Sequence, residues 1–241
     1  MNFNVIEMKR YKIAGLIVAM DSFGKTVEQA KPYLVETDDA PDIIIKSNWQ
    51  RLKEQAPHLS DESCEYLSTG SSFYRQLINF DGIMLHSSAV VMDGKAYLFT
   101  APCKTGKSTH TSLWLKEFGD RAFILNDDKP AIRLEDGVLY AYGTPWSGKT
   151  AQNVNCRVKI GGICILARGE KNEICRVTGK TAVFGLFSQT IRPPKEEYMN
   201  KVLDLIAKLI DNVPIWQLYC NTDPEAAHIS YQAMSAASQN N

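Results

Sequence analysis

The sequence lacks a net charge, a long apolar run and any closely spaced pair of cysteines. Lys and Arg total 27 and Asp and Glu total 27, so the chain has no broad face of one sign for nucleic acid or an anionic membrane. We therefore expect neither of these partners, and we expect any phosphate-binding site to be local.

The six cysteines never form a Cys-x-x-Cys pair, so the spacing typical of metal ligands is absent. A chain of 241 residues can bury a full core without cross-links, and free thiols are typical of reducing compartments. The apolar run from Ile13 to Met20 is too short to cross a bilayer, and no small-residue cleavage site follows it. We expect a cytoplasmic protein without a targeting signal in its first ten residues.

Repeats and low-complexity tracts are also missing, apart from a small polar tail over residues 235–241 that we expect to fray. The remaining pattern alternates between strands and helices. Predicted helices cover residues 26–35, 60–80 with a weak point at Gly70, 108–118, 181–190 and 196–211, and a last helix starts at Pro224. Predicted strands cover residues 11–20, 42–46, 82–92, 96–100, 122–126, 131–134, 138–142, 160–167 and 215–219.

The spacing of these elements changes near residue 80. Residues 1–80 read as a small α/β unit, and residues 81–241 as a second, larger domain of closely spaced strands. Hairpin turns are predicted at Asp93-Gly94 and Asp136-Gly137. Hairpins mixed with helices favour an α/β fold with a mixed sheet over a purely parallel one.

A Gly-Lys pair followed by Ser or Thr occurs four times, at Gly24, Gly106, Gly148 and Gly179. A phosphate-binding loop needs a strand before it and a helix after it, because the first amides of the helix face the phosphates. Residues 143–150 alone meet the strict pattern Gly-x-x-x-x-Gly-Lys-Thr, but a poor helix opening follows them. Residues 101–108 have alanine in place of the first glycine, but a predicted strand precedes them and a predicted helix follows them. We predict the loop there, and residues 19–26 remain the alternative.

Asp127 and Asp128 directly follow the predicted strand 122–126, one helix after this loop. The magnesium ion of a bound nucleotide needs a carboxylate beside the loop hydroxyl. Taken alone, Asn-Asp-Asp-Lys-Pro is equally typical of a turn. Next to a phosphate loop, we interpret the doublet as a metal-handling pair, and no comparable pair follows Thr26.

Four segments together resemble the HPr serine kinase/phosphorylase family, whose wider superfamily includes the phosphoenolpyruvate carboxykinases. They are Leu-His-Ser-Ser-Ala at 85–89, Ala-Pro-Cys-Lys-Thr-Gly-Lys-Ser-Thr at 101–109, Asn-Asp-Asp at 126–128 and Gly-Thr-Pro-Trp-Ser-Gly-Lys at 143–149. The most specific combination is a histidine fifteen residues before the loop with an aspartate pair after it. The resemblance covers roughly residues 74–170 and leaves the N-terminal unit unassigned.

The resemblance implies a mixed β-sheet P-loop core in residues 81–241 that forms a nucleotide-binding catalytic domain. It further implies ATP and Mg²⁺ as cofactors and transfer of the γ-phosphate to a hydroxyl, commonly a serine, on a protein, a peptide or a small molecule. Such an enzyme is a kinase. The resemblance leaves open whether it forms a homo-oligomer. The alternatives are a nucleotide-binding regulatory or scaffold module without catalysis, and a decarboxylating phosphotransfer like that of the carboxykinases.

Carried onto this chain, the resemblance implies that Lys107 contacts the β- and γ-phosphates and that Ser108 ligates magnesium. The expected nucleotide-binding residues are Ala101, Pro102, Cys103, Lys104, Thr105, Gly106, Lys107, Ser108 and Thr109. Relatives usually have small residues and glycine where Cys103 and Lys104 stand. Lys104 therefore either forces a different path of the loop or adds a second positive charge to the site.

The same resemblance gives the aspartates separate roles, with Asp127 as general base and Asp128 as a metal ligand, and the two roles are open to exchange. Neighbouring carboxylates push their pKa values apart, which suits such a division. His86 is expected to orient phosphate or acceptor, although a lone histidine in an apolar run is otherwise typical of a core. For the acceptor side we expect Lys149 as an anion clamp, Trp146 as a stacking or shielding residue, and Arg168 as a phosphate-neutralising residue.

Overall fold

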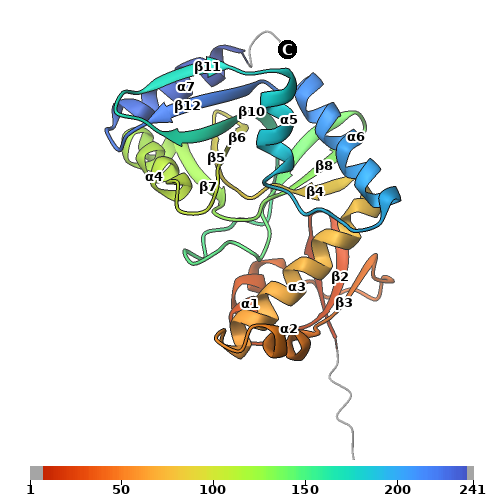
Figure 1. Ribbon diagram of the computed structural model, residues 1–241. Helices are drawn as coiled ribbons and strands as arrows, with labels where there is room; N and C mark the ends of the chain where they lie inside the picture. Colours follow the sequence, from red (N-terminus) through yellow and green to blue (C-terminus); the bar gives the residue numbers. More distant parts are fainter. Residues whose placement is uncertain (1–7, 238–241) are drawn as a thin grey trace, which may run out of the picture.

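The computed structural model describes residues 8–237. The prediction of no targeting signal concerns residues 1–10, of which 1–7 lie outside this range. Of the tail 235–241 that we expected to fray, residues 235–237 instead end a helix, and residues 238–241 lie outside the range. Within it, the chain forms seven α-helices and two β-sheets. Figure 1 shows the smaller sheet with α1 and α2 in one part of the molecule and the larger sheet with α4 to α7 in the other, joined by the long helix α3.

The smaller sheet has the strand order β1-β2-β3, formed by Lys9–Ile13, Leu16–Asp21 and Ile43–Lys46. We predicted one strand over residues 11–20, which is wrong, because the chain reverses at Ala14 and Gly15. Their φ angles of 51° and 81° are both positive, and two-residue hairpin turns that match the strand twist require this. A connection through α1 (Gly24–Ala30) and a 3₁₀ turn (Lys31–Tyr33) then places β3 parallel to β2.

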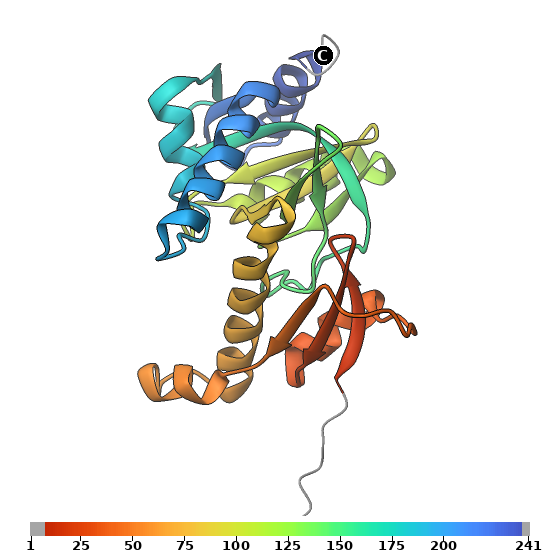
Figure 2. The same cartoon turned by 90° about the vertical axis from the view of Figure 1, so that its right-hand side faces the viewer.

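Helix α3 (Asp61–Leu77) follows the short helix α2 (Trp49–Gln55) and runs past the smaller sheet toward the larger one (Figure 2). The hydroxyl of Ser60 caps its first turn by accepting from the backbone N–H of Ser63, and Asp61 and Glu62 favour the positive end of the helix dipole. The helix continues without a break through Gly70, where we predicted a weak point. A 3₁₀ turn (Ile78–Phe80) ends it.

The larger sheet has nine strands among the described residues, and the mixed sheet predicted from the sequence is confirmed. Its central order is β4-β8-β9-β10-β6-β5-β7, and β12 pairs with β10 and β11. Strand β10 is parallel to β6 and β12, and the other pairs are antiparallel. The strands are Gly82–Met84, Ser87–Met92, Lys95–Thr100, Ala122–Asn126, Ala131–Glu135, Val138–Tyr142, Arg157–Arg168, Glu173–Arg176 and Ile215–Cys220, numbered β4 to β12 in this order.

Helices cover both faces of this sheet, and alternate side chains of β6 show how. Ala96 and Leu98 point into one apolar cluster with α5 (Gly179–Phe187) and α6 (Glu196–Asn212). Tyr97 and Phe99 point into another with α4 (Lys107–Phe118) and α7 (Glu225–Ala237). Successive residues of a strand face opposite sides, so β6 is buried on both. The C-terminal end of β6 therefore holds the start of the loop that leads into α4 in a fixed position.

A third apolar cluster spans the boundary predicted at residue 80. It joins side chains of the smaller sheet and α3 to side chains of β4, β8, β9 and the loop after β9, with Tyr33, Phe73, Tyr74, Met84, Tyr142 and Trp146 among its members. The N-terminal unit thus packs directly against the segment that follows β9. The division into two domains at residues 80 and 81 stays a prediction.

Candidate functional site

The segment Ala101–Gly106 turns from the end of β6 into the start of α4. Two positions of this turn have positive φ angles, Lys104 at 65° and Gly106 at 122°. Non-glycine residues rarely take this conformation, since it costs them about 1–2 kcal/mol. At Lys104 the backbone is held in place by Arg168, whose guanidinium donates to the carbonyl of Lys104 at 2.8 Å. Lys104 thus adopts the left-handed backbone conformation that glycine takes most readily, and whether its charge serves the site stays a prediction.

Lys107 is the first residue of α4, and its side chain folds back over the turn. Its ammonium donates to the carbonyl of Ala101 at 3.0 Å and to that of Pro102 at 3.5 Å, and only 8% of the residue is exposed. Burial lowers the pKa of Lys107, while the negative charges of Asp128 and Asp127 raise it. Both carboxylates therefore lie near this amine, at the same edge of the sheet.

Asp127 follows β7 and is buried, with hydroxyl donors on both carboxylate oxygens. Ser88 on β5 donates to Oδ1 at 2.6 Å, and Thr150 donates to Oδ2 at 2.9 Å. Thr111 on α4 lies 2.8 Å from the Ser88 hydroxyl and must donate to it, because the proton of Ser88 is already used. A short chain of hydroxyl groups thus links Asp127 to the helix that starts at Lys107.

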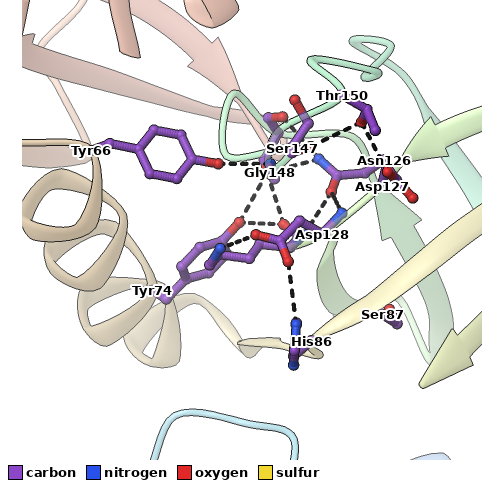
Figure 3. Close-up of polar contacts among 12 residues, drawn as sticks. Tyr66, Tyr74, His86, Ser87, Asn126, Asp127, Asp128, Ser147, Gly148 and Thr150 are labelled. Atoms are coloured by element: carbon purple, nitrogen blue, oxygen red, sulfur yellow. Dashed lines mark hydrogen bonds and ion pairs between the residues drawn. The ribbon is translucent and has the colours of Figure 1, made fainter. Parts of the chain in front are cut away.

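Asp128 has a lysine and a histidine as partners instead (Figure 3). Its carboxylate pairs with the ammonium of Lys129, and Nε2 of His86 lies 3.3 Å from its other oxygen. Burial alone would raise the pKa of Asp128, but the hydrogen bond from His86 and the charge and hydrogen bond of Lys129 together lower it to about 2. Asp128 therefore stays ionised at any physiological pH, and the opposite side of the His86 ring contacts Gln189 at 3.2 Å.

Asn126 sets the backbone geometry of this aspartate pair. Its side-chain oxygen accepts from the backbone N–H groups of Asp128 and Lys129 at 3.0 and 2.7 Å, and its amide donates to the carbonyl of Thr144 at 2.9 Å. The Asn-Asp-Asp segment is therefore a turn, and its role as a metal-handling pair stays a prediction.

The N-terminal unit contributes residues to this site that the sequence analysis missed. Tyr66 of α3 accepts from the backbone N–H of Gly148 at 2.8 Å, and Gln29 of α1 donates to the carbonyl of Gly148 at 3.2 Å. The segment that carries Thr150 is thereby fixed to helices far away in sequence. A Cβ atom at Gly148 would lie 2.9 Å from Cβ of Asp128, so this close approach requires glycine.

Two of the other Gly-Lys-Thr segments do not offer a comparable loop. Residues 143–150 follow β9, but the chain continues through turns and into β10 without a helix, as the sequence indicated. Residues 19–26 do connect β2 with α1. However, Thr26 is fully buried and its hydroxyl is bound to Glu65, so it is not available to a ligand.

The three residues expected on the acceptor side lie in different environments. Trp146 is fully buried, stacks on Phe73 with ring centroids 4.9 Å apart, and donates to Thr69, so its role is to pack and not to stack on an acceptor. Lys149 is exposed and lines an open cavity beside α1. Arg168 is exposed and contacts the loop at Lys104.

Two open cavities flank the turn 101–106, of about 630 and 380 Å³, and Lys104, Thr105 and Arg168 line both. No group of three or more His, Cys, Asp or Glu side chains that could hold a metal occurs in residues 8–237. Magnesium is usually bound by one or two carboxylates together with substrate phosphates, so the exposed Ser108 hydroxyl and Asp128 suit an ion that arrives with a nucleotide. No helix in the described range is long and apolar enough to span a bilayer.

Comparisons with known proteins add a distant structural relationship. Neither a family model nor a curated protein matches the sequence. Among solved structures, the Hpr(Ser) kinase/phosphatase from Coxiella burnetii aligns with 62% of this chain and 96% of its own, at 14% sequence identity and a TM-score of 0.39. At that level the alignment indicates a remote likeness only, and the functional argument rests on the site itself.

Proposed function

We propose that the protein is an ATP-dependent kinase that transfers the γ-phosphate to a hydroxyl group of a protein, a peptide or a small molecule. The observation that carries this proposal is that Lys107, Asp127 and Asp128 lie at the edge of the larger sheet where β6 and β7 end, and that both carboxylates act on the pKa of Lys107. A phosphoryl transfer needs phosphate binding, charge neutralisation and a group that positions the acceptor hydroxyl, and this edge offers all three.

The nucleotide would bind across the turn Ala101–Gly106, with Thr105 to Thr109 presenting backbone amides at the start of α4. A helix of 12 residues gives these amides a full dipole. Lys107 would exchange its carbonyl partners for the β- and γ-phosphates, because no carboxylate of the described residues holds it in an ion pair. Arg168 would add charge from the neighbouring strand, at the rim of both flanking cavities.

Asp127 and Asp128 would have different roles because their surroundings differ. Asp128, whose pKa is lowered to about 2, suits the metal side together with Ser108, and bound Mg²⁺ would neutralise the charge on the transferring group. Asp127 accepts hydrogen bonds from two hydroxyl groups, and its remaining lone pairs would accept an acceptor hydroxyl and then take its proton. His86, which contacts Asp128, would orient the carboxylate of Asp128.

The test is ADP formation with ATP and Mg²⁺ in a screen of hydroxyl acceptors. Lys107→Ala and Asp127→Asn should each lower kcat/KM at least a hundredfold, a loss of about 3 kcal/mol or more of transition-state stabilisation. Lys116→Ala, in the last turn of the same helix, is the matched control and should leave kcat/KM within about twofold. Unchanged turnover in Lys107→Ala would sink the proposal.

One observation favours a second candidate, a nucleotide-binding module that does not transfer phosphate. Asp128 is already paired with the ammonium of Lys129 and contacts His86, so the site can hold this carboxylate without a metal ion. Titration calorimetry separates the two, since this module would bind ATP without any acceptor-dependent release of ADP. An assay with oxaloacetate tests the third alternative, decarboxylating phosphotransfer.

A further inference from the structure

A group of lysines lies around the ring of Tyr66, next to the aspartate pair. The ammonium of Lys25 on α1 lies 4.6 Å from the ring centroid, and that of Lys129 lies 5.5 Å from it. Burial and the positive charge of Lys129 lower the pKa of Lys25, the negative charge of Asp128 partly offsets this, and the positive charge of Lys149 lowers it further. Three cations from three separate segments of the chain are thus close enough to repel one another.

The negative charge available to these cations is small. Asp128 is already paired with Lys129 and His86. In the described range, no carboxylate forms an ion pair with Lys25 or Lys149. Partly desolvated cations in such a cluster repel one another unless an anion joins them, so the arrangement favours binding of a negatively charged group.

Lys25 and Lys149 also line one open cavity of about 660 Å³, with Lys9 at its wall. Two carboxylates share this wall. These are Glu28, which is paired with Lys31 at 2.5 Å, and Glu62, so Lys9, Lys25 and Lys149 leave the lining an excess of one positive charge. Its volume lies within the range typical of small-molecule sites.

The cavity adjoins the reacting edge through one short segment. Lys149 and Ala151 line the cavity, and Thr150 between them donates to Asp127 at 2.9 Å. A molecule bound against Lys149 would therefore lie beside the segment whose Thr150 contacts the carboxylate to which we assign the acceptor proton.

We propose that Lys25 and Lys149 form an anion subsite for the acceptor, so that the acceptor is a hydroxyl compound carrying a carboxylate or a phosphate group. This inference rests on the proposed function for the reaction, but the subsite itself is built from residues outside the phosphate loop. It also gives the N-terminal unit a direct role, since Lys25 belongs to α1.

The kinetic test uses pairs of acceptors that differ in their anionic group: L-serine with L-serinamide, and glycerol 3-phosphate with glycerol. The anionic member should have the higher kcat/KM, and the two pairs distinguish a carboxylate from a phosphate. Lys25→Met should lower kcat/KM for the anionic member at least tenfold, mainly through KM, and leave the KM for ATP within twofold. Lys25→Arg should restore most of the loss. Lys12→Met, at an exposed lysine on β1 outside the cavity lining, is the matched control. An equal effect of Lys25→Met on both members of a pair would overturn the inference.

A second experiment needs no turnover. Pyridoxal 5′-phosphate forms an imine with a lysine amine with loss of water, and borohydride reduces the imine to a stable secondary amine that peptide mapping locates. Lys25 or Lys149 should react at least fivefold faster with this probe than with uncharged pyridoxal, both with and without ATP and Mg²⁺. Lys107 should instead be protected by ATP.

The outcomes separate the two proposals. Loss of ATP protection at Lys107 with a retained preference of Lys25 for the phosphorylated probe would contradict the proposed kinase and keep the anion subsite. Equal reaction of Lys25 and Lys149 with both probes, or protection of Lys25 by ATP, would overturn the subsite and leave the kinase proposal intact.

Discussion

At the scale of single residues, Glu65 is a fully buried carboxyl group on α3 with few partners. Thr26 donates to one of its oxygens, whereas the other has no hydrogen-bond partner. Burial raises the pKa of Glu65 to about 7, and the hydrogen bonds from Thr26 and from the backbone of Phe23 only partly offset this rise. The folded protein therefore holds a proton on Glu65 at a pH where the unfolded chain has lost it.

This difference predicts how stability depends on pH. Between the unfolded pKa of 4.5 and the folded value of about 7, the folded state binds more protons, so the free energy of unfolding falls as the pH rises. The total loss is about 3 kcal/mol, and no further loss from this group occurs above the window. Urea unfolding at pH 5 and pH 8 measures it. Glu65→Gln should remove most of this slope, whereas Glu54→Gln, on the exposed side of α2, should keep it. An unchanged slope in Glu65→Gln would assign the pH dependence to other groups.

Most residues of the proposed site carry a sequence signal, but their partners do not. The loop at Lys107, His86 and the aspartate pair fall in short motifs that a single sequence displays. Tyr66, Gln29 and Lys25 reach the same place through contacts between segments that lie far apart in the chain, such as the 119 residues between Gln29 and Gly148. No local pattern encodes such contacts, because they arise only when the smaller sheet packs against the loop after β9.

At the scale of secondary structure, the sequence predicts buried helices and strands more accurately than exposed ones. Strand β7 has the predicted bounds, and α4 and α6 begin or end within one residue of them, since apolar periodicity or a glycine marks them. Helix α2 and strand β11 were missed. Helix α2 has no buried residue, and the residues of β11 are mostly exposed, so neither displays a periodic apolar pattern.

The substitution Gly70→Ala tests whether local helix propensity or packing decides the stability of α3. Glycine inside a helix usually costs about 1 kcal/mol relative to alanine, so local propensity predicts that Gly70→Ala stabilises α3. A Cβ atom at this position would lie 2.9 Å from Cδ1 of the buried Trp146, and packing therefore predicts the opposite. We expect Gly70→Ala to destabilise the protein by about 1–3 kcal/mol in urea unfolding. The neighbouring Ser71→Ala is the matched control and should change stability by less than about 1 kcal/mol. A stabilised Gly70→Ala variant would show that Trp146 moves aside at little cost.

At the scale of the whole molecule, the two sheets share one apolar cluster. In it, Trp146 of the loop after β9 packs against Phe73 of α3. The same loop holds Thr150 against Asp127, so the packing of the N-terminal unit and the geometry of the proposed site depend on one another. We therefore expect the smaller and the larger sheet to unfold together, even if the sequence divides near residue 80.

Trp146→Ala tests this coupling. Removing the indole should destabilise the protein by about 3–5 kcal/mol, because the cavity is enclosed by Phe73, Tyr74 and Thr69 and collapses poorly. Hydrogen exchange should show an equal loss of protection in β2 and in β6, since both strands open in one cooperative step. Phe123→Ala, whose ring is 42% exposed on β7, is the control and should alter protection in both strands only slightly. Faster exchange confined to β2 would instead mean that the N-terminal unit opens alone. In that case ATP binding should survive at the turn before α4 while the contact of Thr150 with Asp127 is lost.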